Sequence, residues 1–132
     1  MNETAGFPLE IISNFASLVV LIGIIYKFLQ YKKKMEVVQG LITLKQNRNL
    51  TEEDKEFIRT NVLDYEIQLQ KDNALIKFAY PFFILIIGIL MVTFSTADAL
   101  IHINIVVVTF IYLYVGKIHS QNFIKLLKPL QN

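Results

Sequence analysis

Apolar and charged residues are strongly separated along this chain, and three long apolar runs stand out. The first covers residues 11–29 and contains Lys27 as its single charged residue. The second and third, residues 78–97 and 99–116, contain no charged residue and are separated by Asp98. A helix of the first run's length spans about 28 Å, close to the ~30 Å hydrocarbon core. Because unpaired backbone groups are costly in lipid, the pattern predicts an all-α membrane protein with three transmembrane helices.

The segment between the first two runs, residues 31–75, has a different pattern and is predicted to form a helical hairpin. The first arm shares one apolar face, which includes Val38, Leu41 and Ile42. Polar residues 46–49 then interrupt the pattern, and Thr51, followed by three acidic residues, is typical of a helix start. Apolar residues of the second arm are spaced by four, three and four positions: Ile58, Val62, Tyr65 and Leu69. This narrow seam is typical of a coiled coil and predicts antiparallel packing of the two arms.

The basic residues indicate the orientation. All thirteen Lys and Arg residues lie on one side of a three-crossing arrangement, whereas the opposite side carries Glu3, Glu10 and Asp98. Since cytoplasmic segments are enriched in Lys and Arg, we expect an outside N-terminus, a cytoplasmic hairpin and a cytoplasmic C-terminus. Residues 1–9 lack the basic region of a cleavable signal peptide, so the first run is expected to remain as an anchor. We expect residues 1–132 to form a single domain of the cell (inner) membrane.

The composition narrows the possible chemistry. The absence of Cys excludes disulfides, thiolate metal sites and Cys nucleophiles. A formal net charge of +2 gives no support to nucleic-acid binding. The sequence contains no Gly-rich phosphate loop, no HExxH motif and no Ser/His/Asp set that the topology could bring together. We therefore expect no enzymatic activity, no metal and no cofactor.

Polar residues at the outer end of the predicted helices form a candidate ion or proton site: Glu10, Asn14, Asp98, His102 and Asn104. Asp98 and His102 are four residues apart and so share a helix face. Ionisable groups within the hydrocarbon are costly unless they are paired, and they commonly have a function. The alternative is that Asp98 caps the third helix while His102 reaches the headgroups. Haem ligation is not expected, because the other histidine, His119, lies about 25 Å away along the helix.

Three further features concern packing. Ser13 and Ser17 have the spacing of small residues at contacts between membrane helices. Pro81 cannot donate a hydrogen bond to the carbonyl of Lys77, so we expect a kink there. Residues 117–132 form an amphipathic tail, which is expected to extend the third helix along or out of the membrane interface until Pro129.

The expected topology resembles the minimal core of the YidC-type insertases and a shortened version of the ExbB/TolQ/MotA stator subunits. Both resemblances concern layout alone. Because the mixed pattern of seam and charge is confined to the hairpin, the first expectation is a non-catalytic subunit or accessory factor of a membrane complex. Its hairpin would dock a protein partner or a second copy of the chain. The alternatives are a homo-oligomeric pore that uses Asp98 and His102, and an insertase-like assembly helper.

Overall fold

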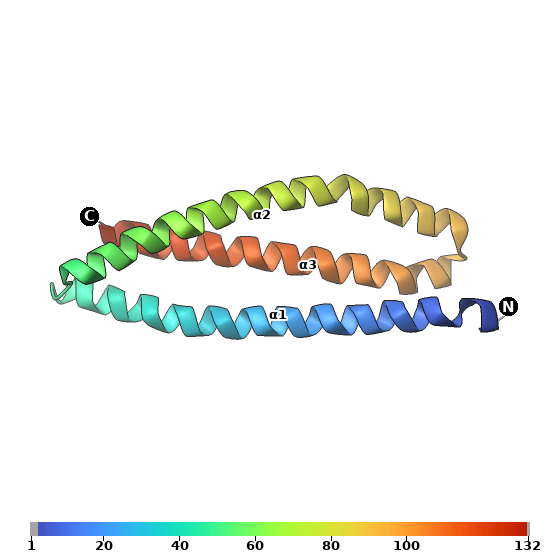
Figure 1. Ribbon diagram of the computed structural model, residues 1–132, viewed down its shortest axis with the longest axis horizontal. Helices are drawn as coiled ribbons and strands as arrows, with labels where there is room; N and C mark the ends of the chain where they lie inside the picture. Colours follow the sequence, from blue (N-terminus) through green and yellow to red (C-terminus); the bar gives the residue numbers. More distant parts are fainter. Residues whose placement is uncertain (1–2, 132) are drawn as a thin grey trace.

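The computed structural model describes the backbone of residues 3–131 and the side chains of residues 10–131. Within this part the chain is entirely helical, with α1 (Glu3–Gln46), α2 (Glu52–Thr93), α3 (Thr96–Leu127) and the short 3₁₀ helix η1 (Lys128–Gln131). Figure 1 shows that α1 begins beside the α2–α3 connection, whereas α3 ends near the α1–α2 turn. We call these the N-terminal end and the turn end. The predicted all-helical fold is confirmed.

Each long helix continues through the boundaries that the sequence pattern suggested. The 44 residues of α1 correspond to about 66 Å and join the first apolar run to the first hairpin arm. In the same way, α2 joins the second arm to the second apolar run, and α3 joins the third run to most of the tail. All three helices are long and apolar enough to cross a membrane. The arrangement is therefore compatible with an integral membrane protein.

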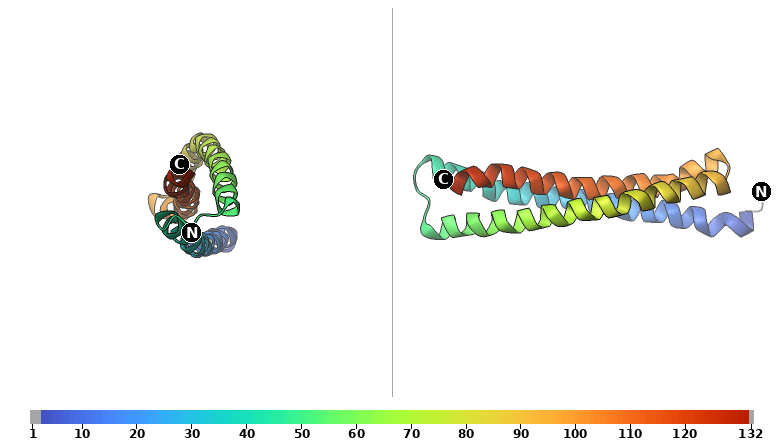
Figure 2. Two further views of the ribbon diagram at one scale, coloured as in Figure 1. Left: turned by 90° about the vertical axis from the view of Figure 1, so that its left-hand side faces the viewer. Right: turned by 90° about the horizontal axis from the view of Figure 1, so that it is seen from above.

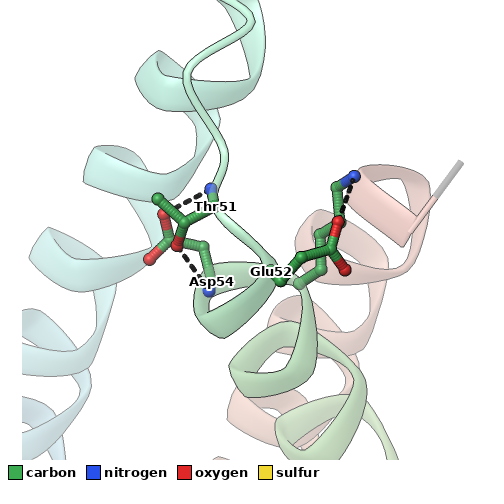
Figure 3. A network of polar contacts seen from close by, with 4 residues as sticks. Thr51, Glu52 and Asp54 are labelled. Carbon is green, nitrogen blue, oxygen red and sulfur yellow. Dashed lines mark hydrogen bonds and ion pairs between the residues drawn. The ribbon is translucent and has the colours of Figure 1, made fainter.

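The α1–α2 turn is built from two capping motifs. Arg48 adopts a left-handed conformation with φ of 58°, and Asn49 N donates to Leu44 O at 2.8 Å, which is the pattern of a Schellman end. At the start of α2, Asp54 N donates to the Thr51 hydroxyl, and Thr51 N donates to the Asp54 carboxylate, both at 3.1 Å (Figure 3). This capping box confirms the helix start predicted at Thr51.

Helix α3 is the packing centre of the molecule. It runs along both α1 and α2, while those two helices make few direct contacts with each other. Figure 2 shows the result as one elongated bundle of three helices. The predicted hairpin therefore lacks the packing of a two-stranded coiled coil, because the amphipathic tail of α3 supplies a third helix. Phe123, Leu127 and Leu130 fill the space between the two arms.

The half of the bundle next to the N-terminal end, which we call the N-terminal half, has a different surface from the turn end. Apolar side chains of α1 are exposed along most of residues 11–29, and those of α2 along most of residues 78–92. Soluble monomers rarely expose apolar patches that extend over so many side chains. In this half, α2 remains helical through Pro81 and is bowed rather than broken, as Figure 1 shows.

Candidate functional site

The residues of the predicted outer polar cluster differ in burial. His102 is buried, with 8% of its surface exposed. The other four members all have exposed side chains: Glu10, Asn14, Asp98 and Asn104. Ser95, rather than Asp98, is the cap of α3, because its hydroxyl accepts a hydrogen bond from Asp98 N at 3.3 Å. Asp98 lies in the first turn, where a negative charge faces the positive end of the helix.

His102 instead joins α3 to α1. Its Nδ1 forms a hydrogen bond of 2.8 Å with the Ser13 hydroxyl, and its ring centroid lies 4.9 Å from that of Phe94. Ser17, one turn further along α1, is also buried, and its hydroxyl has no hydrogen-bond partner among the described residues. Ser13 and Ser17 therefore both lie inside the bundle. His102, which the sequence pattern assigned to a candidate ion site, is hydrogen-bonded to α1.

At the turn end, the residues proposed for partner docking are occupied within the chain. Val38, Leu41, Ile58 and Val62 are buried together with the apolar residues of the tail. The remaining members of the set, which are partly buried, are Ile42, Tyr65 and Leu69. Sequence reasoning identified this face correctly as apolar. Its contacts, however, are made with α3 and η1, so the seam itself is not a free surface.

An open groove remains beside this core. It has a volume of about 340 Å³ and lies between α1 and α2, with Leu127 at its base. Val37 and Phe57 line it and keep 52% and 46% of their surface exposed. Asn61 and Lys34 contribute polar groups to the same groove. The groove therefore combines exposed apolar side chains with a polar border.

A second hollow, which we call the recess, lies where the apolar halves of the helices meet the turn-end bundle. It has a volume of about 420 Å³ and receives residues from all three long helices. Its α1 wall carries Lys27 and Lys34, and its α2 wall carries Asp64 and Asp72. Gly116 and His119 of α3 complete the lining. Sequence reasoning did not find this site.

Lys27 points into the bundle. Its Nζ lies 4.1 Å from the centroid of the Tyr112 ring, and a Cβ built on Gly116 would stand 2.7 Å from the same Nζ. Gly116 therefore makes room for the ammonium group. The same Cβ position is 3.7 Å from Asp72 Oδ2, so a base of α1 and an acid of α2 approach one point on α3.

The opposite charges of the recess face each other without direct ion pairs. Among the described side chains, the ion pairs within 4.0 Å are Lys55–Glu52, Arg59–Glu56 and Lys128–Glu66, all outside the recess. Asp72 Oδ1 accepts a hydrogen bond of 2.9 Å from Gln68. Lys34 lies over the Tyr65 ring, with its Nζ 5.7 Å from the centroid. Each lysine thus contacts an aromatic face in preference to a carboxylate.

The positive charges of Lys27 and Lys34 both act on His119. Its ring stacks on Tyr31 at 4.1 Å between centroids. Burial lowers the pKa of His119, and the positive charges of Lys27 and Lys34 lower this pKa further. On the opposite wall, burial and the nearby Asp64 carboxylate raise the pKa of Tyr65. The α1 side is therefore electropositive, the α2 side is electronegative, and the surroundings of His119 favour its neutral form.

Comparison with known protein families, with curated proteins and with solved structures finds no match for this chain. The described residues contain no group of three His, Asp or Glu side chains that could hold a metal ion.

Proposed function

We propose that this chain is a non-catalytic integral membrane subunit or accessory factor. Its three long helices cross the bilayer, with the N-terminus outside and the C-terminus in the cytoplasm. The turn-end bundle stands in the cytoplasm and docks a protein partner. The support for the orientation is the charge pattern, because all thirteen Lys and Arg residues belong to the side that carries the turn and the C-terminus.

The observation that carries the docking proposal is the exposed apolar groove between α1 and α2. Val37 and Phe57 are about half exposed, although neighbouring Val38 and Ile58 are almost fully buried. The side chains of Val37 and Phe57 therefore remain exposed beside a core that is filled by other residues of the bundle. Aromatic side chains such as Phe57 are enriched at protein interfaces, and interface hot spots are surrounded by contacts that exclude water.

The test is a pair of charge substitutions in the groove. Val37→Asp with Phe57→Asp should remove a partner that co-purifies in mild detergent, because an unpaired carboxylate in a buried contact costs several kcal/mol. Thr60→Asp is the matched control, since Thr60 is exposed on α2 and does not line the groove. Yield and thermal stability should stay near wild type in both. Retention of the partner by the double variant would contradict docking through this groove.

The recess favours a second candidate, an insertase-like assembly helper. Polar and charged side chains of α1, α2 and α3 gather there, next to helices whose other halves are apolar. A hollow of this kind suits the transient passage of a polar segment from the cytoplasm towards the bilayer. Photo-crosslinking from Gln68, which lines the recess, distinguishes the two functions. Newly made membrane proteins as crosslinked products would favour the helper, and one stable partner would favour the subunit.

A further inference from the structure

The recess lies at one level of all three helices. On α1 it begins at Tyr26 and Lys27, in the last turn of the first apolar run. On α3 it begins at Gly116, the last residue of the third run. On α2 it ends at Asp72, a few residues before the second run begins. If the helices span the bilayer as proposed, the recess stands at the height of the cytoplasmic headgroups.

Lys27 is oriented differently from an ordinary interfacial lysine. A lysine near the end of a membrane helix usually extends outward to the lipid headgroups. Lys27 is partly buried, and its ammonium group lies against Tyr112 and Gly116 of α3. A π face compensates part of the charge, but the three N–H groups of an ammonium require hydrogen-bond acceptors. The recess therefore presents a cation that needs an acceptor oxygen.

The charges in the recess have a matching arrangement. Lys27 and Lys34 lie on α1, Asp64 and Asp72 lie on α2, and no ion pair joins the two walls among the described residues. Two positive and two negative side chains face a hollow of about 420 Å³, which is within the size range of small-molecule sites. An occupant with one negative and one positive group would satisfy both walls. A purely anionic occupant would face the two carboxylates.

We propose that the recess binds the headgroup of an amine-bearing zwitterionic phospholipid. The phosphate lies at Lys27 and the ammonium group lies at Asp72, the base and the acid that approach Gly116 from opposite walls. Lys34 and Asp64 add a second pair of opposite charges about 10 Å further towards the turn end. Lysine ammonium groups bind phosphate oxygens, and carboxylates with aromatic rings bind ammonium groups. The shared chemistry is a phosphate joined to an amine, which a membrane lipid or free phosphoethanolamine could supply. A headgroup is favoured, because the recess adjoins the apolar halves of the helices.

Gly116→Ala offers a mild way to disturb the site. The new Cβ would stand 2.7 Å from Lys27 Nζ, the far end of a flexible side chain, so the ammonium group must move while the backbone stays in place. Gly88→Ala is the matched control, because a Cβ there meets nothing within 4 Å. Lys27→Gln and Asp72→Asn remove one charge from each wall and give a second, independent reading of the same site.

The experiment is native mass spectrometry of the full chain in mild detergent, titrated with phosphatidylethanolamine, phosphatidylglycerol or free phosphoethanolamine. We expect phosphatidylethanolamine to bind most tightly. Gly116→Ala, Lys27→Gln and Asp72→Asn should each weaken its binding by about tenfold, the effect of losing one charge-assisted contact, while Gly88→Ala binds as wild type. Free phosphoethanolamine that competes fully would support the site and assign a soluble source.

Three results would overturn the proposal. The first is equal or tighter binding of phosphatidylglycerol, which would show that the acidic wall does not select a zwitterion. The second is unchanged phosphatidylethanolamine binding in all three recess variants. The third is displacement of the lipid by a polypeptide segment that crosslinks to the recess, which would assign the hollow to protein passage.

Discussion

The two halves of this molecule use the same three helices in different ways. At the turn end, apolar residues are concentrated on inward faces and buried in one core, with charged residues outside. At the N-terminal end, apolar residues cover the outside, while the interior contains Ser13, Ser17 and His102. The turn end has the pattern of a soluble bundle. The N-terminal half has the pattern of helices that pack through small and polar residues in lipid.

This difference explains why the chain needs its tail. The two helical arms alone would leave part of their apolar faces exposed, because neither arm is wide enough to cover the apolar face of the other. The continuation of α3 brings Phe123 and Leu127 between the arms, and η1 adds Leu130. In the N-terminal half no such filling is required, because lipid can cover apolar surfaces. Stability of the turn end should therefore depend on packing far more than stability of the other half.

The largest expected effect compares one isoleucine from each half. Ile58 is 1% exposed in the turn-end core, whereas Ile22 is 58% exposed on α1. Ile58→Ala should lower the free energy of unfolding by about 3 kcal/mol, through lost burial and a residual cavity. Ile22→Ala should change it little, because in a bilayer the side chain contacts lipid before and after folding. Denaturant titration in bicelles measures both, and equal losses would remove the contrast between the halves.

A smaller effect is expected at the polar interior of the N-terminal half. Ser13→Ala removes the hydrogen bond to His102 and should cost about 0.6 kcal/mol, the average for such bonds between membrane helices. Ser17→Ala is the control, because the Ser17 hydroxyl has no partner among the described residues, and its removal should be neutral or slightly stabilising. If the two variants lose the same stability in bicelles, the Ser13–His102 bond has no special role.

The recess should give the turn end a modest dependence on pH. The pKa of His119 is lowered in the folded chain, so the folded state favours the neutral ring. The resulting stability is present above the unfolded pKa of about 6.5 and is lost as the pH falls through the folded pKa. The thermal midpoint of the wild type should therefore decrease between pH 7.5 and 5.5. His119→Gln should decrease less over this range, and an equal decrease would exclude His119 as the source.

The smallest effect is expected in the turn. Arg48 has φ of 58°, a conformation that costs a residue with a side chain about 1–2 kcal/mol. Glycine avoids this cost. However, glycine has more conformational freedom to lose on folding, which lowers the stability by about 0.5–1 kcal/mol. Arg48→Gly should therefore stabilise the turn end by about 0.5 kcal/mol. A clear loss of stability in the same denaturant titration would indicate that the Arg48 side chain makes a contribution of its own.

The local features of this fold could be predicted from the sequence, whereas the contacts between distant segments could not. Thr51 and the acidic residues after it define a helix start through neighbouring atoms, so the cap was predictable. The tail's apolar face was also visible, but periodicity does not reveal which surface covers it. Asp98 and His102 share a helix face by spacing, yet one is exposed and the other buried, because depth in a bundle depends on its neighbours.

The recess shows the same limit. Lys27 is visible in the sequence as a charge within an apolar run, and Gly116 as a small residue at the end of another. Their proximity depends on how α1 and α3 are rotated against each other, which no local pattern encodes. The signal that could have drawn attention to the site is Lys27 itself, since a charged residue inside a predicted membrane helix commonly has a partner.

The most direct test of the proposed division between a membrane half and a cytoplasmic half is the accessibility of its two ends. The chain contains no Cys, so single variants can be labelled without background. Asn47 and Thr96 are both exposed, at the turn end and the N-terminal end respectively. With a membrane-impermeant maleimide, Thr96→Cys should react in intact cells, and Asn47→Cys should react only after permeabilisation. Reaction of Asn47→Cys in intact cells would contradict the proposed topology and the cytoplasmic location of the bundle.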